Sequence, residues 1–238
     1  MNDVKKNDVS IIVPALNEEL NLRGAVDNII KELKGINYEI LIFNDGSTDR
    51  TGNIAEEISI LDSRIKVIHH KTPQNLGSCF REGVELATGE YAIMIPGDDE
   101  VDSQTIHNLF SEIGRADIIT TYTVNTNIRS IKRRFISFVY TALINGLFNL
   151  RLKYFNGPSL IKVDLLRKLP PISQGFAYMS EILVRLIKSG YSYRETEMFI
   201  KLLPGRKSRA FGLNNFKQIY LAIVRLFIDV YFKKRLIL

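Results

Sequence analysis

The fold is indicated most clearly by residues 38–49, which read YEILIFNDGSTD. An apolar run typical of a β-strand is followed at once by a turn that contains Asp45 and Asp49. Residues 91–100, YAIMIPGDDE, have the same design. Carboxylates at the carboxyl ends of parallel strands lie where open α/β sheets bind ligands. Because clustered carboxylate oxygens suit a hard divalent cation, the two turns predict a nucleotide-dependent transferase whose substrate carries a diphosphate.

Length and composition fit one compact domain, or one domain with a small satellite. The chain has 238 residues, of which 45% are apolar and 24% are charged, enough for a core of ordinary size. Cys79 is the single cysteine, which excludes an intrachain disulfide framework and fits a reducing compartment. Residues 1–8 are polar, so we expect no signal peptide. No apolar run reaches the length of about 18 residues that a membrane-spanning helix needs.

The alternation of apolar runs and helical periodicity predicts an α/β fold. Strands are expected at residues 9–14, 38–43, 65–68, 91–95 and 117–122. Helices are expected at residues 18–33, after a cap at Asp49, and at residues 76–87 and 103–113. Such a β-α-β-α order favours a mostly parallel sheet with right-handed crossovers.

Charge divides the chain into two unlike halves. Residues 1–128 carry 11 Lys and Arg against 21 Asp and Glu, whereas residues 129–238 carry 21 against 5. A basic half of this kind suits anionic lipid, phosphorylated acceptors or nucleic acid, although it is also typical of a solvated surface.

Two helices of the basic half are expected to have wide apolar faces. In residues 135–150 and the preceding turn, a narrow polar stripe is formed by Arg133, Ser137, Thr141, Asn145 and Asn149. In residues 214–234 the stripe is formed by Asn214, Gln218, Ala222, Arg225, Asp229 and Lys233. Such helices lie in a membrane interface, or they pack on each other, on the sheet or in a dimer. The basic residues that flank both helices favour the membrane surface.

Four ordered motifs resemble family 2 glycosyltransferases, most closely the polyprenyl (dolichyl) phosphate mannosyltransferase-like branch. They are VPALNEE at 13–19, FNDGSTDRT at 43–51, the group of NLG, REG and ATGEY within 75–91, and PGD at 96–98. The resemblance implies a GT-A type fold, Rossmann-like, in one continuous domain. Residues 1–128 would form the nucleotide-sugar-binding half, and residues 129–238 the acceptor-side half.

The resemblance also implies which residues contact the nucleotide. They are Pro14, Asn17, Glu18, Asp45, Gly77, Arg81, Gly97 and Asp98. Without the family resemblance, each of three residues has a simpler interpretation. Glu18 is an acidic residue that the helix dipole favours at a helix start, Asp49 is a helix cap, and Arg81 is a surface residue.

A divalent cation, Mg²⁺ or Mn²⁺, is implied at the second acidic turn. Asp98 is the expected catalytic metal ligand, and Glu100 is the expected second ligand. The sequence departs from the family pattern at two places, because Pro96 stands for the first acid of an Asp-x-Asp motif and Asn44 for the first acid before Gly-Ser.

The acceptor side is implied by a carboxylate and by basic residues. Glu181 matches the acid of the family's acceptor-side helix and would act as a base or orient the acceptor. Alternatively, Glu181 pairs with Arg185 four residues later. Arg133, Arg134, Arg206, Ser208 and Arg209 would bind phosphate groups. His69, His70 and His107 are expected to be satisfied or exposed, and Cys79 to be a packing residue.

Together these features predict an inverting glycosyltransferase that uses a GDP- or UDP-sugar, with a polyprenyl phosphate as the preferred acceptor. We expect it in the cytoplasm, peripheral at the inner face of the membrane, with no nucleic-acid partner and with a homodimer as an open alternative. The other interpretations are a transferase for a polysaccharide or other non-lipid acceptor and a catalytically weak sugar-nucleotide-binding protein.

Overall fold

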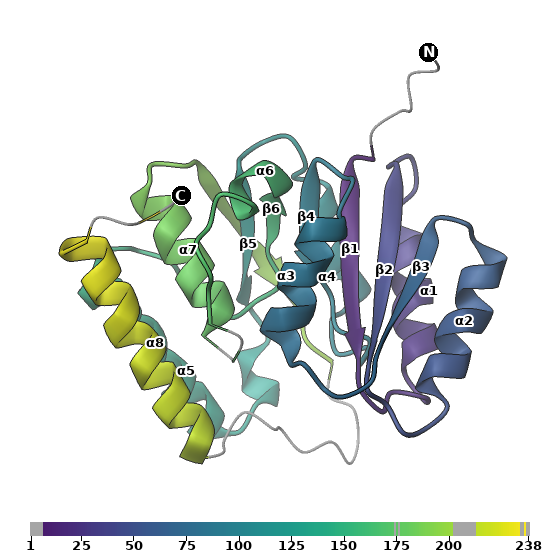
Figure 1. Ribbon diagram of the computed structural model, residues 1–238. Helices are drawn as coiled ribbons and strands as arrows, with labels where there is room; N and C mark the ends of the chain where they lie inside the picture. Colours follow the sequence, from purple (N-terminus) through teal and green to yellow (C-terminus); the bar gives the residue numbers. More distant parts are fainter. Residues whose placement is uncertain (1–6, 174, 176, 202–212, 234–235, 237–238) are drawn as a thin grey trace.

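The computed structural model describes residues 7–173, 175, 177–201, 213–233 and 236, with residues 213–216 described by their backbone alone. A seven-stranded sheet runs through the molecule with helices on both faces (Figure 1). The strands are β1 Val9–Ala15, β2 Tyr38–Asp45, β3 Ile65–His70, β4 Tyr91–Met94, β5 Ile118–Thr123, β6 Leu160–Lys162 and β7 Tyr193–Met198. The helices are α1 Leu22–Glu32, α2 Thr51–Leu61, α3 Leu76–Leu86, α4 Ser103–Phe110, the 3₁₀ turn η1 Thr126–Ile128, α5 Ile131–Phe148, α6 Val163–Leu166, α7 Tyr178–Lys188 and α8 Leu213–Tyr231.

The sheet order is β3-β2-β1-β4-β6-β5-β7. Strands β1 to β4 are parallel to their neighbours in this group, and β5 is parallel to β7. The chain builds outward from β1 to β3 and then returns to place β4 on the other side of β1. This reversal is a topological switch point, and ligands of open α/β sheets bind outside the carboxyl ends of the strands there. The prediction of a mostly parallel α/β fold is confirmed.

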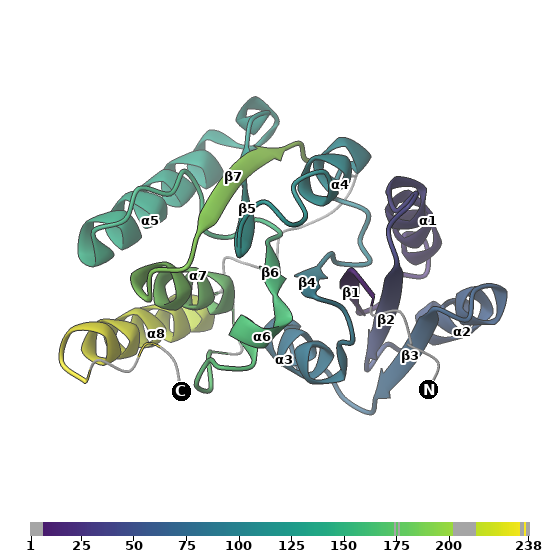
Figure 2. The ribbon, with the colours of Figure 1, turned by 90° about the horizontal axis from the view of Figure 1, so that it is seen from above.

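Two apolar layers hold the helices to the sheet. Every residue of β1 and of β2 is buried, as expected for central strands covered on both faces. On one face, α1, α2 and α4 pack through Leu22, Ala55 and Ile106. On the other face, α3, α5, α7 and α8 form a second layer (Figure 2).

Strands β6 and β7 were not predicted from the sequence. β6 has three residues and runs antiparallel to both β4 and β5. β7 reads YRETEM, with one buried residue, because it forms the edge of the sheet. A run this short and a strand this polar lack the apolar signal by which strands are recognised.

Several predicted boundaries differ from the observed ones by one turn. α1 begins at Leu22 rather than Glu18, because residues 16–21 form a loop that crosses the end of the sheet. α4 ends at Phe110 rather than Ile113. α5 begins at Ile131, where the Ser130 hydroxyl accepts a hydrogen bond from the Arg133 backbone N–H. The expected start of α2 is confirmed, since the Asp49 carboxylate accepts from the Thr51 backbone N–H.

The carboxyl ends of α5 and α8 meet at the end of the molecule away from β3 (Figure 2). The ring of Phe148 on α5 stacks on Tyr231 of α8, with 6.3 Å between ring centroids, and the Tyr231 hydroxyl donates to the Leu147 carbonyl. The expectation that these helices pack on each other is therefore correct for one face of each. Among the described residues, no helix combines the length and the apolar content needed to cross a bilayer.

Candidate functional site

The carboxyl ends of β1 and β4 meet at the switch point. The Gly97 backbone N–H donates to the Pro14 carbonyl at 3.0 Å, so these two predicted residues lie next to each other. A Cβ atom at Gly97 would lie 2.9 Å from Leu22 and 3.2 Å from Ala15. Glycine is therefore required by the close approach of the loop after β4 to the loop after β1.

Asn17 and Glu18 tie the loop after β1 to the loop after β2. The Asn17 side chain accepts from the Thr48 backbone N–H at 2.8 Å, and the Glu18 backbone N–H donates to the Thr51 hydroxyl at 2.8 Å. The Glu18 carboxylate accepts from Asn21 at 2.8 Å. These bonds shape the entrance of the crevice, and the predicted contacts of Asn17 and Glu18 with nucleotide stay predictions.

Asp45 faces the start of α3. Its carboxylate is 5% exposed and accepts from the backbone N–H groups of Gln74 at 2.7 Å and Asn75 at 3.2 Å. Gly77 is buried in the first turn of α3, and Arg81 is exposed one turn later. The structure therefore brings Asp45 and Gly77 together at one helix start, and it leaves Arg81 open to solvent.

Within the described part of the chain, one group of three potential metal ligands has its atoms within 4.8 Å of one another, namely Asp45, His70 and Cys79. Imidazole and thiolate are ligands that soft or borderline metals prefer, unlike Mg²⁺. Burial raises the pKa of the Cys79 thiol to about 12, so the thiol is protonated at neutral pH. Both ring nitrogens of His70 contact carboxylates, Asp45 at 2.7 Å and Glu82 at 2.9 Å. Hydrogen bonds account for this cluster, and we assign it no metal.

The acidic turn after β4 separates its carboxylates into different roles. Asp99 adopts a left-handed backbone conformation, with φ of 54°, and its carboxylate contacts Asn28 at 2.7 Å and Lys201 at 3.0 Å. The Asp99 carboxylate therefore connects the acidic turn to α1 and to the segment after β7. Asp98 accepts from the Glu100 backbone N–H at 3.1 Å. Asp102 caps α4 by accepting from the Gln104 backbone N–H.

The residues Asp98 and Glu100 fit a hard cation by their chemistry. Mg²⁺ is typically held by one or two carboxylates, with waters and substrate phosphates completing its coordination. Pro96 leaves the turn with fewer carboxylates than the family pattern, but Asp98 and Glu100 still supply two.

The predicted phosphate-binding loop lies outside the described residues, and with it Arg206, Ser208 and Arg209. The segment that leads to it is described, because the Lys201 backbone N–H donates to the Glu100 carbonyl at 3.0 Å. Lys201, the last described residue before this loop, therefore lies beside the acidic turn.

Arg133 and Arg134 lie in the first turn of α5, the former half-buried and the latter exposed. β5 points in the same direction as β4, since both run antiparallel to β6. α5 begins eight residues after β5 ends, so its first turn follows the same edge of the sheet as the acidic turns.

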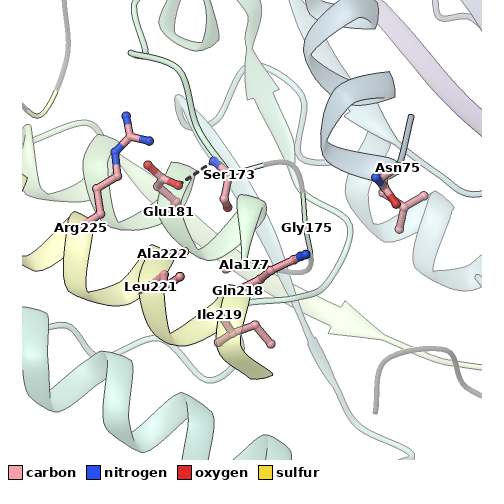
Figure 3. A pocket seen from close by; sticks show the side chains of 11 residues that line it. Asn75, Ser173, Gly175, Ala177, Glu181, Gln218, Ile219, Leu221, Ala222 and Arg225 are labelled. Carbon is pink, nitrogen blue, oxygen red and sulfur yellow. Dashed lines mark hydrogen bonds between the residues drawn. The ribbon is translucent and has the colours of Figure 1, made fainter. Parts of the chain in front are cut away.

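A cavity of about 480 Å³ lies between the start of α3, the start of α7 and α8. Figure 3 shows Glu181 and Ser173 facing the side chains that α8 contributes. The lining includes Asn75, Ser173, Glu181, Gln218, Ala222 and Arg225.

Glu181 is held firmly inside this cavity wall. It is 3% exposed, and its Oε2 atom accepts from the Ser173 backbone N–H at 2.9 Å. Its Oε1 atom accepts from Arg185 at 3.0 Å, which confirms the predicted pairing. Arg185 also contacts Asp229 of α8 at 2.8 Å. Burial alone would raise the pKa of Asp229, but the Arg185 hydrogen bond and the positive charges of Arg185, Lys233 and Arg225 together outweigh it, and the pKa is lowered.

Sequence reasoning missed the contributions of Ser173 and Arg225 to this cavity and the contact of Asp229 with Arg185 behind it. The signal was present, because Gln218, Ala222, Arg225 and Asp229 belong to the polar stripe of α8. The structure places Gln218, Ala222 and Arg225 at the cavity and Asp229 against α7. The apolar residues Tyr220, Val224 and Ile228 of α8 are exposed.

Comparisons with known proteins agree with this geometry. The chain is 30% identical over 109 residues to the glycosyltransferase GlyG of Streptococcus pneumoniae serotype 4, a match that covers 46% of this chain and 36% of the relative. It is 38% identical over 104 residues to the uncharacterized glycosyltransferase EpsJ of Bacillus subtilis, covering 44% and 30%. The chain therefore spans about a third of the length of the curated relatives it matches.

Among solved structures, the chain is similar to glucosyl-3-phosphoglycerate synthase from Mycobacterium tuberculosis in complex with uridine diphosphate. The TM-score is 0.67 at 16% identity, and the match covers 94% of this chain and 79% of the other. This likeness confirms the GT-A fold. A sequence model described as Glycosyl transferase family 2 matches residues 10–170, more than half of the chain. The chain belongs to glycosyltransferase family 2.

Proposed function

We propose that this protein transfers a sugar from a nucleotide-sugar, carrying GDP or UDP, to a polyprenyl phosphate with inversion at the anomeric carbon. The observation that supports this most is the position of Asp98 and Glu100 at the switch point of the sheet. The Glu181 cavity, which we assign to the acceptor, meets the same region through Asn75 at the start of α3.

The donor would lie across the crevice at the carboxyl ends of β1, β2 and β4. Pro14 and Gly97 form its floor, Asn17 and Glu18 its entrance, and Asp45 with Gly77 the wall at α3. Arg81 is free to turn toward the diphosphate as a bidentate donor. A structure of the Mycobacterium tuberculosis synthase is described in complex with Mn²⁺, uridine diphosphate and phosphoglyceric acid, which supports a nucleotide donor and a divalent cation here.

Asp98 and Glu100 would hold Mg²⁺ or Mn²⁺. A cation bound there neutralises negative charge that grows on the leaving diphosphate. The protein's own residues supply positioning, which accounts for much of the barrier reduction in a displacement of this kind.

In the transfer step, an oxygen of the acceptor forms a bond to C1 of the sugar while the bond from C1 to the diphosphate oxygen breaks. A phosphate monoester is already ionised near neutral pH, so it needs no strong base. Both oxygens of Glu181 accept hydrogen bonds from Ser173 and Arg185, which favours a role in orienting the acceptor. Arg133, Arg134, Arg206, Ser208 and Arg209 are the proposed phosphate-binding residues.

The lipid acceptor is supported by the outer faces of α5 and α8. Exposed apolar side chains there include Phe135 at 65%, Phe138 at 70%, Val224 at 38% and Phe232 at 75%. Exposed basic residues stand at the ends of both helices, at Lys132, Arg134, Lys217 and Lys233. Apolar area flanked by cations is the surface that anionic lipid attracts. We therefore propose a peripheral site at the inner face of the cytoplasmic membrane.

Vesicle sedimentation tests the lipid assignment. Replacing Phe135, Phe138, Val224 and Phe232 by Ser should abolish binding to vesicles that contain anionic lipid. A matched control replaces Ile60 and Leu61, exposed on α2 at 81% and 78%, and should bind as the wild type does. Binding of the wild type should fall with added salt, because surface charges are screened within about 10 Å at 0.1 M. Unchanged vesicle binding of the α5/α8 variant would contradict the proposal that these helices bind lipid.

A transferase for a non-lipid acceptor is the second candidate. The same apolar faces would then form a homodimer, and the solved synthase is described with the water-soluble phosphoglyceric acid. Sedimentation velocity without lipid and transfer assays with polyprenyl phosphate, phosphoglyceric acid and oligosaccharides separate the two. A third candidate, a sugar-nucleotide-binding protein with weak catalysis, is motivated by Pro96 and Asn44, and nucleotide binding without turnover on any acceptor would support it.

A further inference from the structure

His70 stands between two carboxylates at the end of β3. Its Nδ1 atom lies 2.7 Å from Asp45 and its Nε2 atom 2.9 Å from Glu82, and its side chain is 11% exposed. An ionised carboxylate only accepts hydrogen bonds, and a neutral imidazole has a single N–H. Both contacts are hydrogen bonds together only if the ring carries two protons, so the geometry describes an imidazolium.

The contact with Asp45 follows from the sheet register. Asp45 and His70 are direct partners in the parallel pair of β2 and β3. The Asp45 carboxylate therefore receives His70 from the strand and the backbone N–H groups of Gln74 and Asn75 from the next loop. Three donors converge on one carboxylate, and they fix the path of residues 71–75.

The loop held in this way is packed tightly against the turn after β2. A Cβ atom at Gly46 would lie 2.8 Å from Pro73 and from the Thr72 backbone. Asn75, the residue before α3, adopts φ of 71°. The wall of the proposed nucleotide crevice thus depends on a strained turn and on a close contact between two loops.

The groups that face the His70 ring come from two neighbouring elements. Asp45 and the ring of Phe43, at 5.6 Å between centroids, belong to β2, and Glu82 belongs to α3. Cys79 of α3 contacts the Asp45 carboxylate through its protonated thiol. Burial alone would lower the pKa of His70, but the hydrogen bonds with Asp45 and Glu82 outweigh it, and the pKa is raised.

We propose that His70 is a positioning residue for nucleotide-sugar binding, whose imidazolium holds Asp45 and the β3–α3 loop in the shape that receives the nucleotide. This inference rests on the proposed function. Since the folded protein favours the charged ring, the bridge is complete below the pKa of His70 and is lost as pH rises through it. Affinity for the nucleotide should follow the same course.

Isothermal titration with UDP-glucose and GDP-mannose, each with Mn²⁺, tests the proposal between about pH 6 and about pH 9, a span that brackets histidine titration. The diphosphate of a nucleotide-sugar is a diester and lacks the ionisation of a phosphate monoester at about pH 6, so the diphosphate does not titrate over this span. For the wild type, we expect the affinity for one of these two to fall with pH. For His70→Gln, we expect affinity at low pH to be about tenfold weaker, the effect of losing a charge-assisted hydrogen bond, and flat with pH.

Two further variants keep the test sharp. His107→Gln removes an exposed histidine that pairs with Glu32 on the opposite layer, and it should reproduce the wild-type profile. Glu82→Gln leaves the contact with Asp45 in place but removes one anion, so it should bind nucleotide and lose affinity at a lower pH than the wild type does. It tests the proposal even if His70→Gln fails to fold.

The outcomes separate this inference from the proposed function. If the wild type binds one nucleotide-sugar, but with an affinity that His70→Gln and Glu82→Gln leave unchanged at every pH, the role of His70 is wrong and the transferase assignment stands. If the wild type binds neither nucleotide-sugar at any pH, the donor assignment itself is overturned, and this inference with it.

Discussion

At the scale of single residues, Arg185 connects the acceptor cavity to the last helix. Its side chain has no exposed surface and lies between Glu181 and Asp229. Removing one partner of a buried ion pair leaves the other charges without compensation in a medium that solvates them poorly. The position of α8 and the orientation of Glu181 are therefore coupled through one guanidinium group.

Arg185→Met should lower the free energy of unfolding by about 3–5 kcal/mol, the usual cost of breaking a buried ion pair. Urea denaturation followed by circular dichroism measures it. Arg23→Met is the control, since Arg23 and Glu57 form an exposed pair, at 44% and 53%, worth at most about 1 kcal/mol. Equal small losses in both variants would show that the buried cluster does not hold α7 to α8.

Glu39 makes a second buried connection, at the start of β2. It is 3% exposed and accepts from Ser10 at 2.7 Å, from the Thr88 backbone N–H at 2.6 Å and from Lys66 at 3.2 Å. Burial alone would raise the pKa of Glu39, but these hydrogen bonds outweigh it and the pKa is lowered. The ionised carboxylate therefore stabilises the fold at neutral pH, and this contribution is lost as pH falls through the lowered pKa.

Glu39→Gln should reduce the free energy of unfolding at neutral pH by about 1–3 kcal/mol, because buried donors lose a charged acceptor. The difference in free energy of unfolding between wild type and variant should become smaller as the pH is lowered. Urea denaturation of both proteins over an acidic pH series measures the difference between their free energies of unfolding. The titration of the other carboxylates is common to both proteins and cancels in this difference. A difference independent of pH would contradict the assignment.

At the scale of elements, the turns on the two sides of β2 each contain a glycine with a left-handed backbone. Gly46 has φ of 74° and touches the β3–α3 loop, whereas Gly35 has φ of 81° and nothing within 4 Å of an added Cβ. A side chain at either position would make the left-handed backbone conformation unfavourable. Only at Gly46 would the side chain also collide with neighbouring atoms.

Gly35→Ala should destabilise the protein by about 1–2 kcal/mol, the cost of the left-handed conformation. Gly46→Ala should cost about 1–3 kcal/mol more, since it also forces the two loops apart, and it should weaken nucleotide binding. Thermal denaturation and titration of nucleotide into both variants measure these effects. The same stability and affinity in the two variants would mean that the loops separate at no cost.

The first five strands could be predicted from the sequence because buried parallel strands are continuous apolar runs bounded by helices. β6 and β7 could not, because one has three residues and the other is a polar edge strand. The acidic turns and the Glu181–Arg185 pair were found from local spacing. The contacts of Asp45 with His70 and of Arg185 with Asp229 were not, since the register of two strands and the direction of a helix stripe set them.

At the scale of the whole molecule, the two charge halves meet in one sheet. The acidic half supplies β1 to β4 and the turns at the switch point, and the basic half supplies α5, α7, α8 and the edge strand. The acidic turn contacts the basic half at Lys201, whose backbone N–H donates to the Glu100 carbonyl and whose Nζ pairs with Asp99. A diphosphate with its cation would lie between carboxylates from one half and Arg and Lys residues from the other.

The most direct test of this account is a thermal-shift panel of nucleoside diphosphates and nucleotide-sugars, each with Mn²⁺, Mg²⁺ or EDTA. A ligand at about 100 times its Kd should stabilise the protein by roughly 2.7 kcal/mol. We predict a metal-dependent shift with one base, lost in Asp98→Ala and retained in Asp164→Ala, an exposed control on α6. No shift with any nucleotide, or a shift that EDTA and Asp98→Ala both leave intact, would contradict it.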